Sequence, residues 1–177
     1  MLPYLFVVLA VLWRVALSIL PYPLGFTPVA ASLLFFGAKA ERKRMWIPIV
    51  LLVGSDLYLT LSYYGYKLTA DHFVTWAWYA AILGLGGLLK KNSKPVRVVG
   101  ASLTASVSFF LVSNFAVWLV WNMYPMTLAG LLQCYTVGLP YFRHSLLGDL
   151  LFAGVFFSVP ALLRTAQAQK AQRIAAP

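Results

Sequence analysis

The residues best suited to chemistry in this chain are carboxylates placed inside apolar stretches. Asp56 follows a continuous apolar run at residues 49–53, and Asp149 comes just after Leu146 and Leu147, although the whole chain has only four acidic residues. A carboxylate in hydrocarbon costs several kcal/mol unless it is paired or faces a wet cavity. Asp56 and Asp149 are therefore predicted to serve ion pairing or binding.

Arg14 is the expected partner of Asp56. Each lies about 11 residues from the inner end of its predicted segment, which is roughly 16 Å at the helical rise. Equal depth and opposite charge predict a buried ion pair. Two interpretations of the pair stay open: a structural bridge between helices, or the floor or gate of a binding cavity.

The elements that position these groups are membrane helices. The chain has 177 residues, of which 62% are hydrophobic, and too little polar sequence to cover a water-soluble surface. A transmembrane β-barrel would alternate apolar and polar residues, whereas the runs here are continuously apolar. The predicted fold is an all-α, polytopic membrane bundle.

Six transmembrane helices are expected, with one extra apolar piece. The predicted spans are residues 3–20, 27–38, 45–63, 72–89, 98–121 and 146–163. Residues 127–139 end at Pro140 and are predicted to form a short re-entrant or interfacial helix before the last span, although a crossing by this piece stays open. The transmembrane domain covers residues 1–163, and residues 164–177 form a basic cytoplasmic tail.

The net charge of +10 is concentrated in three places. Two predicted loops and the tail carry it: Lys39, Arg42, Lys43 and Arg44, then Lys90, Lys91, Lys94 and Arg97, then Arg164, Lys170 and Arg173. Each cluster abuts an apolar segment, which is typical of the positive-inside rule and of contact with anionic lipid rather than nucleic acid. The charge pattern predicts a multi-pass protein of the inner (plasma) membrane with both termini in the cytoplasm.

The predicted outer connections, residues 21–26, 64–71 and 122–145, hold most of the chemically versatile side chains. The candidate ligand-binding residues are Thr27, Asn114, Tyr124, Gln133, Tyr135 and Asp149, with His72 and His144 at the mouth. Helix starts after Tyr22 and Pro23, and after Tyr124 and Pro125, would offer free backbone N–H groups at Thr27 and Thr127. Other roles stay open: an aromatic belt for the tyrosines, helix packing for Asn114, and a helix cap for Asp149.

Enzymatic and metal chemistry are not predicted. The chain has a single cysteine, Cys134, and no His-x-x-x-His pair, glycine-rich phosphate loop or Gly-x-Ser-x-Gly motif. The spacing of His72, His144 and Cys134 fits no standard metal site. We therefore expect neither a catalytic residue, nor a bound metal, nor a cofactor.

Several short motifs resemble a family of small, functionally uncharacterised bacterial membrane proteins. They are the sequence from Phe26 to Ala31, then Ser55, Asp56 and Leu57, then a block with Tyr124, Pro125, Thr127, Gly130, Cys134 and Tyr135, and finally Leu147, Gly148 and Asp149. The matches span about residues 22 to 157 in patches. The resemblance implies a membrane location and brings no activity with it.

The expected architecture also resembles the substrate-binding S components of energy-coupling-factor vitamin transporters, including the solitary cobalamin importers. This second resemblance rests on six short helices, cytoplasmic termini and polar outer loops, without a shared motif. It implies a protein that binds and imports a small metabolite such as a vitamin, with or without an energising partner. The alternative hypothesis is a structural or accessory subunit of a larger membrane complex.

Overall fold

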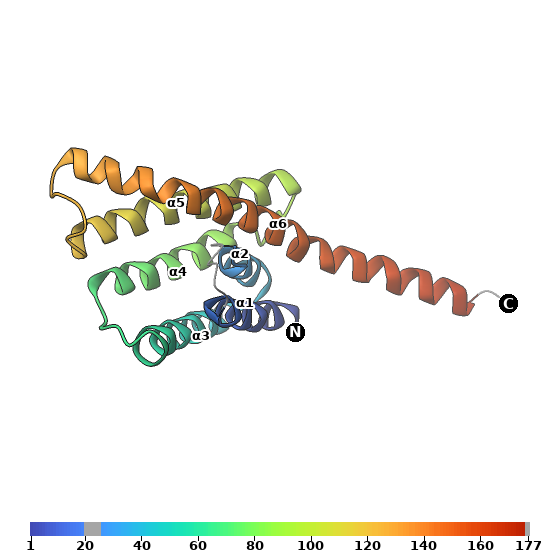
Figure 1. Ribbon diagram of the computed structural model, residues 1–177. Coiled ribbons are helices and arrows are strands. Elements are labelled where there is room, and N and C mark those ends of the chain that lie inside the picture. The colour runs from blue at the N-terminus through green and yellow to red at the C-terminus, as the bar shows by residue number, and fades with distance from the viewer. Residues whose placement is uncertain (20–25, 176–177) are drawn as a thin grey trace.

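The computed structural model describes residues 1–19 and 26–175, and these form helices and connecting turns without a strand. The prediction of an all-α fold is confirmed. The elements are α1 (Leu2–Ile19), α2 (Val29–Lys39), the short 3₁₀ turn η1 (Arg42–Arg44), α3 (Trp46–Leu57), the π-helical turn η2 (Tyr58–Tyr63), α4 (Ala70–Leu88), α5 (Pro95–Val120) and α6 (Leu128–Ala175) (Figure 1). The predicted helix entry at Tyr22 and Pro23 lies outside the described residues.

The last helix differs from the prediction. A separate short helix at residues 127–139 is wrong, because α6 runs without interruption from Leu128 to Ala175 and contains Pro140 and Pro160. Proline removes one backbone donor, but membrane helices tolerate it where neighbouring groups compensate. The carbonyl oxygen of Pro140 itself lies 2.8 Å from Nδ1 of His144, one helical turn later. Residues 128–139 are therefore the first quarter of one long helix.

The far end of α6 leaves the bundle. A helix of this length spans about 72 Å, more than twice the roughly 30 Å of a bilayer core. Residues 161–170 are all exposed, and this part of α6 projects away from the other helices in Figure 1. The segment predicted as a basic tail thus continues the helix as far as Ala175.

The centre of the fold is α2, whose residues from Val29 to Ala38 are all buried. It packs against α1, α4, α5 and α6. A helix that is apolar on every side belongs in a core, and α2 carries apolar or small residues all round. Helix α2 begins at Val29 after Pro28 and has no side-chain cap, so Thr27 does not cap it.

Glycines set the distance between α2 and α4. A Cβ on Gly37 would collide with the carbonyl oxygen of Leu83, and one on Gly86 would lie 2.9 Å from Leu34 Cα and closer still to the Leu34 carbonyl oxygen. Only hydrogen fits at these two positions. The two backbones therefore touch directly, as in other membrane helix pairs with small residues at the contact.

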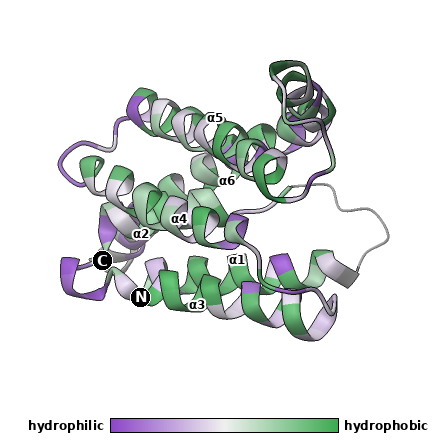
Figure 2. Ribbon diagram, turned by 90° about the vertical axis from the view of Figure 1, so that its left-hand side faces the viewer, coloured by the Kyte–Doolittle hydropathy of each residue, from purple (hydrophilic) through white to green (hydrophobic). Residues whose placement is uncertain are grey.

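The surface has the character of a membrane protein. Three helical stretches are long and apolar enough to cross a bilayer: Arg42–Tyr63, Pro95–Val120 and Leu128–Lys170. Two shorter apolar helices, Leu2–Ser18 and Val29–Lys39, accompany them. Most of the helical ribbon is made of hydrophobic residues, while hydrophilic residues gather at loops and helix ends (Figure 2).

The basic loops meet at one end of the bundle. Lys90 Nζ lies 3.4 Å from the carbonyl oxygen of Ala40, and Lys39 Nζ lies 3.4 Å from Ser93 Oγ. Arg44 reaches Tyr4 near the N-terminus, with 3.2 Å between Nη1 and the phenol oxygen. The connections from η2 to α4 and from α5 to α6 lie at the opposite end, on the left of Figure 1.

This arrangement leads to a labelling prediction. In a Cys134→Ala background, single cysteines in Lys43→Cys, Ser93→Cys and Lys170→Cys variants should all be shielded from a membrane-impermeant thiol reagent in intact cells, because positive clusters stay inside. Permeabilised cells, in which all three should react, provide the control. Labelling of Lys170→Cys alone in intact cells would place the end of α6 outside and overturn the predicted topology.

Candidate functional site: a polar cavity among the helices

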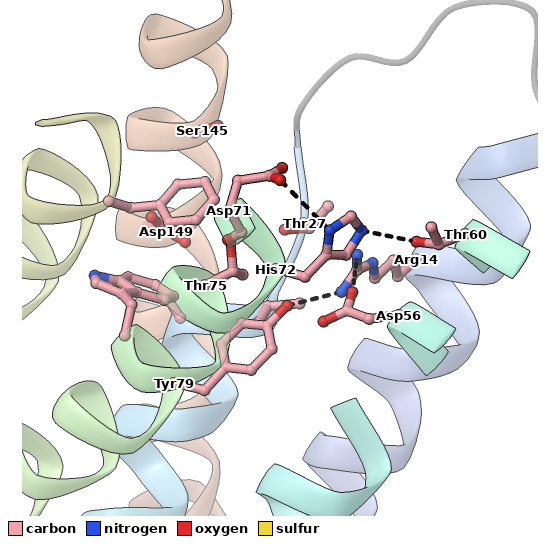
Figure 3. A pocket seen from close by; sticks show the side chains of 14 residues that line it. Arg14, Thr27, Asp56, Thr60, Asp71, His72, Thr75, Tyr79, Ser145 and Asp149 are labelled. Atoms are coloured by element: carbon pink, nitrogen blue, oxygen red, sulfur yellow. Dashed lines mark hydrogen bonds and ion pairs between the residues drawn. The ribbon is translucent and has the colours of Figure 1, made fainter. Parts of the chain in front are cut away.

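A cavity of about 350 Å³ lies at the junction of α1, α3, α4, α5 and α6 with the start of α2. Its polar lining comes from Arg14, Thr27, Asp56, Thr60, Asp71, His72, Thr75, Ser145 and Asp149 (Figure 3). Trp78, Tyr79 and Phe109 form an aromatic part of the wall. Three of the four acidic residues of the chain therefore line one cavity.

The ion pair of Arg14 and Asp56 forms one side of the cavity. The guanidinium Nη2 contacts Asp56 Oδ1, and Nη1 donates a hydrogen bond of 2.8 Å to the Tyr79 hydroxyl. The second carboxylate oxygen of Asp56 accepts a hydrogen bond of 2.9 Å from Trp76 Nε1. Four side chains from α1, α3 and α4 thus form one hydrogen-bonded network, in which the charges of Arg14 and Asp56 balance each other.

His72 lies beside this network, in the first turn of α4. Its Nε2 shares a hydrogen bond of 3.1 Å with Thr60 Oγ1, and its Nδ1 lies 3.2 Å from Thr69 Oγ1 within a capping box. Thr60 belongs to η2, and such wide turns in helices often occur at functional sites. The turn and the cap together fix the imidazole at the cavity wall.

Asp71 lies next to His72 and has fewer partners. Its Oδ1 is buried and accepts no hydrogen bond from the described residues, while His72 Nδ1 is 3.6 Å away. A buried acceptor without a donor is costly unless water or a ligand supplies one. This oxygen is thus a group that a bound molecule could satisfy.

Asp149 lies on the opposite wall, in the middle of α6. Only 7% of the residue is exposed, and Ser106 Oγ donates a hydrogen bond of 2.6 Å to its Oδ2. The helix-cap alternative for Asp149 is wrong, because α6 begins at Leu128. Thr127 is the residue that caps this helix, accepting a 3.2 Å hydrogen bond from the backbone N–H of Gly130.

The structure brings Thr27, His72 and Asp149 to this cavity, together with Arg14 and Asp56. It does not bring Asn114, Tyr124, Gln133, Tyr135 or His144 there. Asn114 lines a separate hollow of about 230 Å³, which shares Phe109 and Ser145 with the cavity. Gln133 and His144 are exposed, Tyr124 is half-buried, and the Tyr135 hydroxyl donates to the Leu111 carbonyl oxygen over 2.8 Å. For Gln133 and Tyr135 the unbroken α6 explains this separation, because it carries residues 128–139 away from the cavity.

Sequence reasoning missed several lining residues: Thr60, Asp71, Thr75, Trp78, Tyr79, Phe109 and Ser145. The α4 members recur at helical spacing, since His72, Thr75 and Tyr79 are three and four residues apart. Side chains at this spacing share one helix face. A polar helix face that begins at the candidate His72 is therefore the sequence signal by which Thr75 and Tyr79 could have been predicted as lining residues.

Nearly the whole chain matches one protein family. Residues 1–172 match the model described as "Family of unknown function (DUF6580)". The chain belongs to this family. Membership agrees with the motif resemblance to an uncharacterised family and assigns no activity to the cavity.

No curated protein matches the chain, and no solved structure matches it. Within the described residues, no three His, Cys, Asp or Glu side chains are grouped closely enough to hold a metal ion. The residues that line the cavity offer hydrogen bonds, charges and aromatic contacts.

Proposed function

We propose that this protein binds a small polar metabolite in the cavity and takes part in its import across the membrane. The observation that carries the proposal is the gathering of Asp56, Asp71 and Asp149 around one hollow in a chain otherwise so poor in acidic residues. Ionisable residues within membrane helices are expensive and usually mark substrate or ion pathways.

The size of the cavity supports this function. Ligand pockets commonly measure about 300–1,000 Å³ and combine an apolar lining with a few convergent polar groups. The cavity of about 350 Å³ falls at the lower end of that range. A small metabolite with one polar end and one ring or branched end would fill it.

The position of the cavity supports uptake as the role. Asp71 and His72 lie in the first turn of α4, at the end of the bundle away from the contacting basic loops. If the basic loops are cytoplasmic, this end faces outward. An outward-facing polar cavity in a small helical membrane protein is the arrangement of S-component-like binding proteins, which is an analogy of architecture.

Copurification provides the test. The wild-type protein, extracted in mild detergent, should carry a small molecule that mass spectrometry detects after denaturation. Thr75→Trp should reduce its amount about tenfold or more, because the indole would occupy the cavity. Thr136→Trp is the matched control: both threonines donate to the carbonyl four residues earlier, but Thr136 is exposed and outside the cavity.

The outcome separates the two functional hypotheses. Equal amounts of copurified molecule in both variants would show that the cavity is not its site. No copurified molecule in the wild type, together with a protein partner that remains bound, would favour the structural or accessory subunit of a larger complex.

A further inference from the structure

We infer that the ligand of this cavity is an organic cation, an inference that rests on the proposed function and specifies its substrate class. The lining holds three carboxylates and one guanidinium. Arg14 pairs with Asp56, which leaves Asp71 and Asp149 without a matching permanent positive charge. The cavity is thus electronegative although the chain as a whole carries a net charge of +10.

Asp149 is the strongest part of this argument. It is nine-tenths buried and lines the cavity, and it accepts a hydrogen bond from the neutral hydroxyl of Ser106. Among the described residues the ion pairs are Arg14 with Asp56, Arg44 with Glu41 and His72 with Asp71. No Lys, Arg or His therefore pairs with Asp149, and a bound cation would supply the missing charge.

Asp71 makes an independent contribution on the other wall. Its buried Oδ1 accepts no hydrogen bond from the described residues. His72, 3.6 Å away, is also held by Thr60 and Thr69. A ligand with an O–H or N–H group could donate to Asp71 while its positive charge lies toward Asp149. An anionic ligand would instead meet two carboxylates.

The aromatic wall identifies the cation as organic. Trp78 and Phe109 both line the cavity, with ring centroids 4.7 Å apart. The Trp78 N–H is already used, since it donates to Ser108 Oγ over 3.0 Å. Aromatic faces attract cations and bind carbon frameworks, as in sites for quaternary ammonium groups. A cavity with carboxylates and aromatic rings thus fits a positively charged nitrogen attached to apolar carbon.

Three small molecules of the same shape test the charge directly: choline, the neutral 3,3-dimethylbutan-1-ol and the anion 3,3-dimethylbutanoate. Binding to the full-length protein, stripped of copurified molecules and reconstituted in nanodiscs, is measured by tryptophan fluorescence. We expect choline to bind at least about tenfold more tightly than either of the others. Asp149→Asn should weaken choline binding about 30-fold or more, since removing one partner of a buried charge pair has at least that effect.

Glu41→Gln is the matched control, because it removes one negative charge from an exposed loop outside the cavity. It should leave choline binding unchanged. Tighter binding of the neutral or anionic compound, or unchanged choline binding in Asp149→Asn, would overturn the inference while the cavity remained a binding site. If none of the three binds, the charge of the copurified molecule decides: a neutral or anionic molecule refutes the inference, and the absence of any molecule refutes the proposed function as well.

Discussion

Neutralising Arg14 or Asp56 alone should destabilise the protein by about 3 kcal/mol, whereas neutralising both should cost clearly less than the sum. In Arg14→Gln the carboxylate of Asp56, with its side chain 5% exposed, loses its counter-charge. In Asp56→Asn the guanidinium is left with the Tyr79 hydroxyl, while the new amide oxygen can still accept from Trp76 Nε1. The free energies of unfolding of both single variants and the double variant, measured in mixed detergent micelles, give the coupling.

The exposed pair of Arg44 and Glu41 provides the matched control for this cycle. Its side chains are 55% and 74% exposed, and the shortest separation is 3.5 Å. An exposed pair of this kind contributes about 0–1 kcal/mol, so the same cycle with Arg44→Gln and Glu41→Gln should give a coupling near zero. Additive losses for Arg14 and Asp56 would mean that the two charges do not stabilise each other.

Adding one methyl group at Gly86 should be about as damaging as breaking the ion pair. The new Cβ would press on the backbone of Leu34, which cannot move aside as a flexible side chain could. The helices α2 and α4 would have to separate, and we expect a loss of about 3 kcal/mol in the free energy of unfolding. Gly37→Ala should have a similar effect, because its Cβ meets Leu83 and Gly86 from the other side of the same contact.

Gly84→Ala separates this packing effect from helix propensity. Gly84 is in the same helix, α4, but a Cβ there has no neighbour within 4 Å. Alanine is a better helix former than glycine by about 1 kcal/mol, so Gly84→Ala should be neutral or slightly stabilising. Equal losses at Gly84 and Gly86 would show that close approach of the two backbones is not the cause.

The part of the site that could be predicted from sequence follows from charge and depth. Arg14, Asp56 and Asp149 are conspicuous because an ionisable group in an apolar segment must have a partner or a cavity. Counting residues from the segment ends placed Arg14 and Asp56 at the same level, and the structure has them in contact. Thr27 and His72 are candidates because each lies near the start of a predicted helix, and both line the cavity.

Whether the remaining candidates could line the cavity depends on where α6 begins and where it ends. The sequence predicts a helix end at Pro140, which would fold Tyr124, Gln133 and Tyr135 back over the bundle. A helix in hydrocarbon can continue through proline, since its remaining hydrogen bonds have no competing water. Local sequence does not show whether a membrane helix ends at a given proline or continues beyond it. The outcome depends on whether neighbouring helices satisfy the backbone groups that the proline leaves free.

The aromatic wall could not be predicted for a related reason. Trp and Tyr are common wherever a helix meets the membrane interface, so their presence in the sequence does not distinguish a belt from a cavity. Trp78 and Tyr79 are buried because α4 lies close against α2 and turns this face inward. That contact depends on Gly37 and Gly86, which are far apart in the sequence.

The burial of α2 from Val29 to Ala38 constrains how the chain is made. This helix is only about 16 Å long, so it is too short to be retained in the bilayer as an independent span during translation. Part of its covering comes from α6, where Phe157 packs against Phe35 with ring centroids 5.1 Å apart. Because α6 follows the other described helices in the sequence, α2 can reach its final surroundings only after α6 has left the ribosome. Nascent chains that stop before α6 would leave the central helix partly uncovered, and membrane proteases and insertion chaperones would encounter it in that state.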